Sequence, residues 1–151
     1  AGMLTVWVAI TDYTQDNGCL KFIPGKHKKM LPHCPKAQTA IADGWIHEAD
    51  AIALPVKAGS LVLLHPLIPH ASLPNHTNGF RWSFDLRYNV TGQPTGRSHF
   101  PDFIAYSQSQ PERVLQDWKE WRGLWETARR KLSNGEHIPI HRWQSDAPFC
   151  A

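Results

Sequence analysis

This sequence of 151 residues lacks a His-x-Asp or His-x-Glu motif and lacks a long apolar run. No His-x-Asp or His-x-Glu occurs, so no histidine and carboxylate have the spacing that puts two side chains on one face of a strand. No apolar run approaches the roughly 20 residues that a membrane-spanning helix needs. The sequence therefore predicts no membrane partner and at most part of a strand-borne metal site.

Cysteine is also scarce, with only Cys19, Cys34 and Cys150. Their odd number and the absence of a C-x-x-C spacing argue against a disulfide framework and against a zinc knuckle. We therefore expect reduced thiols and a cytoplasmic protein.

Charge of either sign is modest. The 16 basic and 13 acidic residues give a net charge of +3, and the basic residues are scattered except at 26–29 and 129–131. A nucleic-acid-binding protein would gather them in one patch, so we expect no nucleic-acid partner. Apolar residues at 42% and charged residues at 19% are typical of a globular chain, and the length fits one domain with a real core.

Strand patterns fill the first ninety residues. Residues 3–11 alternate, with Thr5, Trp7 and Ala9 on one face. Asp16-Asn17-Gly18 is a hairpin signal, because Asn and Gly tolerate positive φ, and residues 19–23 return as a second strand. Further strands are predicted at 52–56, 60–65 and 81–89, and a turn at 75–79 should bring the last beside the one before it. Residues 26–50 are predicted to be a long loop, which is often a lid or binding segment.

The last sixty residues differ in composition, and we expect them to form an extended tail and one amphipathic helix. Pro111 suits the first helical position and Gly135 lies just past the end, so the helix is predicted over Pro111–Leu132. Its apolar stripe is expected to be core packing. The stripe comprises Val114, Trp118, Trp121, Trp125, Ala128 and Leu132.

The residues that carry chemistry are a histidine just past an apolar strand and an arginine at the start of the next strand. They are His70, which follows residues 61–65, and Arg81. Imidazole suits Fe(II), and a planar guanidinium pairs with a carboxylate through two parallel hydrogen bonds. A lone histidine here is more often a core or rim residue, and Arg81 could be a strand-edge arginine. Together they favour an iron and 2-oxoglutarate site, of which this chain carries one half.

Two longer stretches have a specific pattern. The first runs from Trp7-Val8-Ala9-Ile10 through Asn17-Gly18-Cys19-Leu20 to Pro24-Gly25-Lys26-His27, and the second from Gly59-Ser60 through His65 and His70-Ala71-Ser72 to Asn75. They resemble the W-x-A-L … N-G-C-L-x-x-x-P-G-S-H and G-D-x-x-x-x-H-x-x-x-x-H-x-S-x-x-N patterns of the phytanoyl-CoA dioxygenase family of Fe(II)/2-oxoglutarate oxygenases. Lys26 replaces the usual Ser and Ser60 the common Asp. The resemblance extends to about Asn89.

The resemblance implies a role for five residues. His70 would be the distal iron ligand, and Arg81 would pair with the C5 carboxylate of 2-oxoglutarate. Ser83, facing the same way, would add a hydroxyl hydrogen bond, while Trp7 and Thr5 would face the co-substrate from the neighbouring strand. The family's His-x-Asp, which supplies two further iron ligands, normally lies shortly before the strand at Met3. We therefore expect a fragment that binds Fe(II) weakly and is inactive as it stands.

The fold that the resemblance implies is mainly β, the C-terminal part of a double-stranded β-helix (a cupin-like jelly roll). Residues 1–90 would form the barrel core, and residues 91–151 the tail and helix packed on the same domain. The implied activity is oxidation of a small-molecule substrate, hydroxylation rather than halogenation, with 2-oxoglutarate decarboxylated to succinate. The first strand, without its upstream partner, would expose an edge and favour self-association.

Two other interpretations stay open. One is a catalytically inactive, metal-free cupin-like module that binds or interacts. The other is a homodimer that completes its metal site with a neighbour's histidines. Outside the site, we expect His65 to be a buried histidine hydrogen-bonded to backbone, and Asp85 to pair with Arg87 or Arg81.

Overall fold

The computed structural model describes residues 2–35, 39–95, 100–135 and 148–150. The chain divides into two compact units, residues 1–88 with 141–151, and residues 89–140. Among the described helices, none has the length and apolar character that a bilayer crossing requires.

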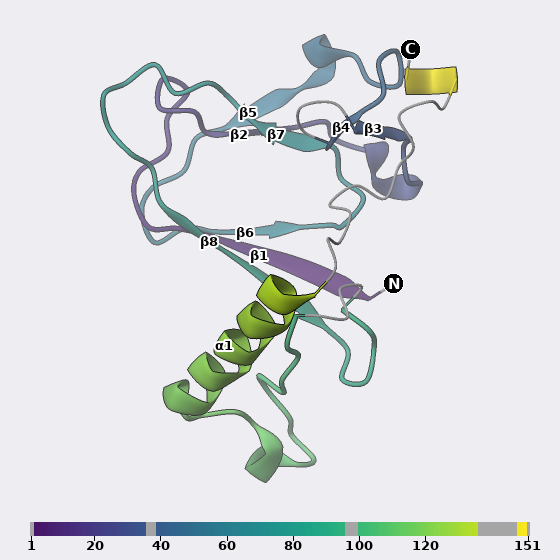
Figure 1. The fold of residues 1–151 in the computed structure, drawn as a ribbon. Helices are drawn as coiled ribbons and strands as arrows, with labels where there is room; N and C mark the ends of the chain where they lie inside the picture. Colours follow the sequence, from purple (N-terminus) through teal and green to yellow (C-terminus); the bar gives the residue numbers. More distant parts are fainter. Residues whose placement is uncertain (1, 36–38, 96–99, 136–147, 151) are drawn as a thin grey trace. The chain divides into compact units, whose positions relative to one another are not determined.

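The first unit is built from two three-stranded sheets, whose strands are labelled in Figure 1. In one sheet, β1 (Met3–Ala9) lies between β6 (Leu61–Leu64) and β8 (Ser83–Asn89). In the other, β2 (Leu20–Phe22) lies between β5 (Ile52–Leu54) and β7 (His70–Ser72). The pairings β1–β6, β2–β5 and β2–β7 are all antiparallel.

The core lies between these sheets. The alternation in β1 buries Thr5, Trp7 and Ala9, as the period of a strand predicts. Trp7 and Ala9 share one buried cluster with residues of the turn after β1 and of β2, and side chains of β5 and β6 pack against that cluster. The cluster comprises Trp7, Ala9, Tyr13, Cys19 and Leu20. Since both sheets contribute, burial of this cluster holds them together.

The turn at Asp16–Gly18 forms, but it does not make a hairpin. Gly18 has φ 85, and the Cys19 amide donates to the Thr14 carbonyl at 2.8 Å. The strands on either side of the turn belong to different sheets. The predicted pairing of the first two strands is therefore wrong, because the turn carries the chain from one sheet to the other.

Strand neighbours also differ from the prediction. β6 and β8 do not pair with one another, because β1 lies between them. The expectation that β1 presents an exposed edge is therefore wrong, and the self-association inferred from that edge loses its basis. His70 begins a strand of its own, β7, in the other sheet, whereas the sequence placed it in a connection.

Residues 26–50 are more ordered than the long loop that was predicted. They contain two 3-10 turns, Lys26–Lys28 and Glu48–Asp50, and a short antiparallel hairpin of β3 (His33–Pro35) and β4 (Thr39–Ile41). The short strands lack the alternation from which a strand can be predicted.

Cys34 and Cys150 form a disulfide, with Cα atoms 5.4 Å apart and a sequence separation of 116. The expectation of three reduced thiols is therefore wrong for this pair, and Cys19 is a buried free thiol. Cysteine spacing could not predict the pair, because β3 and the 3-10 turn Pro148–Cys150 meet only in the folded chain.

In the second unit the helix α1 spans Trp118–Asn134 and begins seven residues later than predicted. Pro111–Arg113 forms a separate 3-10 turn, and Asp117 caps the helix by accepting from the Lys119 amide at 2.8 Å. Gly135 follows the last residue, as predicted. Four of the six stripe residues are exposed, so the expected core packing is wrong for them, and Ala128 alone is buried. The exposed four are Trp118, Trp121, Trp125 and Leu132. Residues 96–99 and 136–147 of the predicted tail lie outside the described part.

The first prediction concerns Gly18. A Cβ atom there would lie 2.5 Å from the Leu73 carbonyl oxygen, whereas at Gly25, with φ 76, it would meet nothing within 4 Å. Gly25→Ala should cost only the left-handed strain, about 1–2 kcal/mol. Gly18→Ala should cost about 1–3 kcal/mol more, because the backbone must also shift. Urea unfolding of both variants measures the difference, and equal losses would contradict the close approach.

Candidate functional site

Three side chains of the first unit form one stacked group, Trp7, Tyr13 and Arg81. The Trp7 and Tyr13 rings meet edge to face with centroids 4.5 Å apart, and the Arg81 guanidinium carbon lies over the Tyr13 ring, 4.9 Å from its centroid. Trp7 and Tyr13 are buried and Arg81 is half-buried. A cation held over an aromatic face is stabilised by the ring quadrupole and keeps its edge N–H groups available.

Backbone pairing holds Arg81 in this position. The Ile10 amide donates to the Trp82 carbonyl at 2.8 Å, and the Trp82 amide donates to Thr11 Oγ1 at 3.0 Å. Upstream, Asn75 closes the predicted turn by donating from Nδ2 to the Gly79 carbonyl at 2.9 Å. Arg81 is thus fixed between a closed turn and the end of β1.

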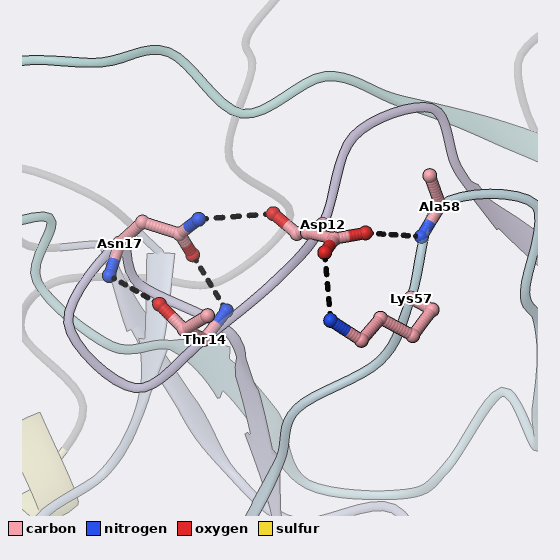
Figure 2. Close-up of polar contacts among 5 residues, drawn as sticks. All are labelled: Asp12, Thr14, Asn17, Lys57 and Ala58. Carbon is pink, nitrogen blue, oxygen red and sulfur yellow. Dashed lines mark hydrogen bonds and ion pairs between the residues drawn. The ribbon is translucent and has the colours of Figure 1, made fainter.

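Tyr13 is held by an isolated antiparallel bridge to Val56, which follows β5. Its amide donates to the Val56 carbonyl at 2.8 Å, and the Val56 amide donates back to the Tyr13 carbonyl at 3.1 Å. The residues on either side of Tyr13 add a polar network (Figure 2). The backbone and ring of Tyr13 are therefore both constrained.

Figure 2 shows that this network has two halves. The Thr14 amide donates to Asn17 Oδ1 and the Asn17 amide donates to Thr14 Oγ1, while Asn17 Nδ2 reaches the Asp12 carbonyl. The Asp12 carboxylate accepts from the Ala58 amide and from Lys57 Nζ, each at 2.9 Å. The network joins the turn after β1 to the turn before β6.

The Asp12 carboxylate has a pKa below its ordinary value of 3.8. The hydrogen bond from the Ala58 amide is the largest cause, and that from Lys57 is the next. Both partners favour the charged form. The Asp12–Lys57 ion pair is largely exposed, so salt screens its contribution.

Gly18 makes room for Arg81. A Cβ atom at this position would lie 3.2 Å from the Pro74 carbonyl oxygen and 3.3 Å from Arg81 Nε, in addition to its contact with Leu73. The Leu73 amide donates to the Cys19 carbonyl at 2.9 Å, and the His76 amide donates to the Asp16 carbonyl at 2.8 Å. The segment from Leu73 to His76, which precedes Arg81, is therefore hydrogen-bonded to the turn that contains Gly18.

His70 lies on the other sheet, opposite Phe22 of β2. Its Nδ1 is 2.8 Å from the Ile68 carbonyl oxygen. Because a carbonyl oxygen can only accept, Nδ1 carries the proton in this bond, and in the neutral ring the Nε2 lone pair is left available. A hydrogen bond of this kind is the usual way in which a metal-binding histidine is oriented.

The remaining predicted residues lie in the β6-β1-β8 sheet or, for His65, directly after β6. Thr5 and Trp7 lie on the buried face of β1, and half-buried Ser83 begins β8 beside it. Asp85 pairs with Arg87 at 3.1 Å, one of the two partners predicted for it. His65 has the expected backbone contact, since its Nδ1 accepts from the Leu67 amide at 3.2 Å, but it is exposed and not buried.

Within residues 2–35, 39–95, 100–135 and 148–150, no three His, Cys, Asp or Glu side chains gather closely enough to hold a metal ion. Among the described residues, His70 therefore belongs to no group of three candidate ligands.

Sequence reasoning missed Tyr13, Asp12 and the steric role of Gly18. For Tyr13 a signal existed, because it has the same parity as Thr5, Trp7 and Ala9 and continues their buried face beyond the strand. The Asp12 contacts could not be found in this way, since their partners lie in a distant turn.

Residues 1–83 of the chain match the family described as phytanoyl-CoA dioxygenase. The zebrafish (Danio rerio) protein named phytanoyl-CoA dioxygenase domain-containing protein 1 is 35% identical over 88 residues, which cover 52% of this chain and 30% of that protein. The mouse (Mus musculus) protein named phytanoyl-CoA dioxygenase, peroxisomal, is 34% identical over 154 residues, covering 91% of this chain and 44% of that protein. The chain thus spans less than half the length of these relatives.

Two solved structures of a non-heme monooxygenase, ThoJ, are similar in fold. The apo form has a TM-score of 0.61 at 24% identity and covers 87% of this chain and 53% of that one. The nickel complex has a TM-score of 0.55 at 20% identity and covers 87% and 52%. This likeness concerns the fold alone, and it confirms the expected mainly-β, cupin-like class.

The second prediction is a pH dependence caused by Asp12. Its folded pKa lies below the ordinary 3.8, so its stabilising contribution is present above pH 3.8 and is lost as pH falls through the folded pKa. Asp12→Asn should therefore lower the melting temperature at pH 7, and the gap to the parent should close progressively below pH 3.8. Asp16→Asn, in the same turn, is the control for removing a charge. A pH-independent gap would contradict the assignment.

Proposed function

This chain belongs to the phytanoyl-CoA dioxygenase family, and from that premise we propose that it carries the co-substrate side of an Fe(II)/2-oxoglutarate-dependent dioxygenase site. One observation carries the proposal. In the described part of the chain, the recorded partner of the Arg81 guanidinium is the face of the Tyr13 ring, and no hydrogen bond or ion pair from it is recorded there. A half-buried guanidinium with its donors available is suited to a carboxylate ligand.

Arg81 would bind the C5 carboxylate of 2-oxoglutarate. The contact with the Tyr13 ring holds the guanidinium group before the ligand arrives, so little side-chain freedom would be lost on binding. Ser83 would add a hydroxyl donor, and Trp7 and Thr5 would line the site from β1, whose face toward the core is buried. A buried lining keeps water from competing for the same hydrogen bonds.

For iron, this chain would supply His70 through Nε2. The described residues hold no set of three ligands, so the fit to a metal ion is incomplete and we derive no catalytic step through it. In the complete site, iron and 2-oxoglutarate would supply the oxidising power for hydroxylating a small-molecule substrate, with succinate as co-product. We also propose that the chain is a fragment of such an enzyme, and that the enzyme is a hydroxylase and not a halogenase.

A second candidate function is a cupin-like binding module without catalysis. The observation that favours it is the same missing set of three ligands in the described part. Such a module would bind the dicarboxylate through Arg81 and show no dependence on Fe(II).

A homodimer that shares histidines between its two copies would instead bind more Fe(II) as the dimeric fraction of the protein increases. The expected cytoplasmic location stays a prediction, since one relative is named peroxisomal.

The third prediction tests Arg81. Arg81→Ala should weaken 2-oxoglutarate binding by about 1.5–3 kcal/mol, because a charge-assisted pair is lost, which is roughly 10- to 150-fold in affinity. Arg81→Lys should recover only part of the loss, since an ammonium cannot present two parallel donors. Calorimetric titration of the purified chain measures both.

The matched control is Arg87→Ala, because Arg87 is exposed and paired with Asp85. It should leave the affinity unchanged. Equal affinities for the parent chain and Arg81→Ala would show that the co-substrate, if bound at all, does not use Arg81, and the proposed site would be wrong.

The fourth prediction tests His70. One imidazole binds Fe(II) weakly, because affinity depends on ligand count and on preset geometry. The chain should therefore bind Fe(II) weakly under anaerobic titration, and His70→Ala should abolish the specific part of that binding, whereas His76→Ala should not. Tight stoichiometric binding that His70→Ala removes would contradict the single-ligand site and point to ligands shared between copies.

A further inference from the structure

The Tyr13 hydroxyl is buried without a partner. Its side chain is 2% exposed, and among the described residues its oxygen is a buried side-chain atom for which no hydrogen bond exists. A phenol is both a donor and an acceptor, and tyrosine in folded proteins usually satisfies its O–H group when it is buried. An unsatisfied polar group in such a place calls for an explanation, and the recognised ones are strain, a catalytic role, or a bound water or ion.

The neighbour that lies over the same ring is also without a polar partner in the described part of the chain. The Arg81 guanidinium carbon lies over the Tyr13 ring, 4.9 Å from its centroid. The guanidinium N–H groups and the phenolic O–H group thus belong to two side chains in contact, and no carboxylate among the described residues pairs with either of them. All of these groups can donate, and one of them carries a positive charge, so the ligand they fit is an anion that accepts several hydrogen bonds.

We propose that Tyr13 is a further binding residue for the co-substrate, whose hydroxyl donates a hydrogen bond to the same carboxylate that Arg81 pairs with. The inference rests on the proposed function, because it takes the ligand class, a dicarboxylate, from that proposal. Two oxygens of one carboxylate offer about four lone-pair sites, which is enough for a paired guanidinium and one phenol.

The surroundings of Tyr13 suit this role because they leave the ring little freedom. Trp7 packs edge to face against it, Val56 pairs with its backbone in both directions, and the neighbouring Asp12 is fastened to Ala58 and Lys57. The hydroxyl is therefore oriented before any ligand arrives, and a preorganised donor gives up little entropy on binding.

Under this proposal, removing the Tyr13 hydroxyl should have opposite effects on the free protein and on the complex. Without ligand, the unsatisfied hydroxyl is a cost, so removing it should leave stability unchanged or raise it. With ligand, the same hydroxyl makes a charge-assisted bond, so removing it should weaken binding. If Tyr13 only packed in the core, removing its hydroxyl would not weaken ligand binding.

The test is Tyr13→Phe in the purified chain, titrated by calorimetry with 2-oxoglutarate and with glutarate, which has both carboxylates but no keto group. The phenylalanine ring keeps the packing on Trp7 and the cation–π contact with Arg81, so folding is preserved. We expect affinity for both dicarboxylates to fall by about tenfold, and the melting temperature without ligand to stay equal or rise. Tyr106→Phe is the matched control, since Tyr106 is 79% exposed, and should change neither quantity.

The outcomes separate this inference from the proposed function. If Arg81→Ala weakens binding and Tyr13→Phe does not, the role of Tyr13 is wrong and the proposed function stands. If the parent chain binds neither dicarboxylate, or if Arg81→Ala leaves its affinity unchanged, the proposed function fails and the inference with it. A lower melting temperature of Tyr13→Phe without ligand would show that the hydroxyl is already satisfied in the free protein, and would also overturn the inference.

Discussion

At Gly18 the backbone passes so close to the carbonyl oxygens of Leu73 and Pro74 that a side chain has no space. This approach occurs where the chain crosses from the sheet of β1 to the sheet of β2. The segment after β7 is fastened along the same turn by backbone hydrogen bonds to Cys19 and Asp16. The turn around Gly18 packs directly against the segment at Leu73 and Pro74. It therefore determines both how the chain crosses between the sheets and where the segment leading to Arg81 runs.

The candidate site inherits its geometry from that constraint. Arg81 lies against the turn because Gly18 leaves room for its Nε, and Tyr13 belongs to the same turn and receives the guanidinium on its ring face. The arrangement leaves a buried hydroxyl unsatisfied, which lowers stability by about 1–3 kcal/mol. Unsatisfied or strained groups persist where the surrounding structure fixes them, and they cluster at binding sites.

The sequence predicted those features that depend on local patterns. The parity of Thr5, Trp7 and Ala9 predicted the buried face of β1, and Asn75 and Gly79 predicted the turn before Arg81. Partners that meet only after folding were not predictable, which is why the pairing of β1 between β6 and β8 and the Cys34–Cys150 disulfide were missed. The helix start was misplaced because Pro111 and Asp117 are both good starting residues, and only the Asp117 cap leads into the helix.

Of the two residues that identify the candidate site, His70 lies on β7 and Arg81 lies just before β8 of the other sheet, so their relation depends on strand register. His70 is fixed by its pairing opposite Phe22, whereas Arg81 is fixed by the contacts of Trp82 with the end of β1. A slip of one residue in either sheet would turn the affected side chains to the opposite face. The buried cluster shared by Trp7 and Leu20 prevents such a slip, because either shift would expose part of it. Core packing and site geometry are therefore determined by the same registers.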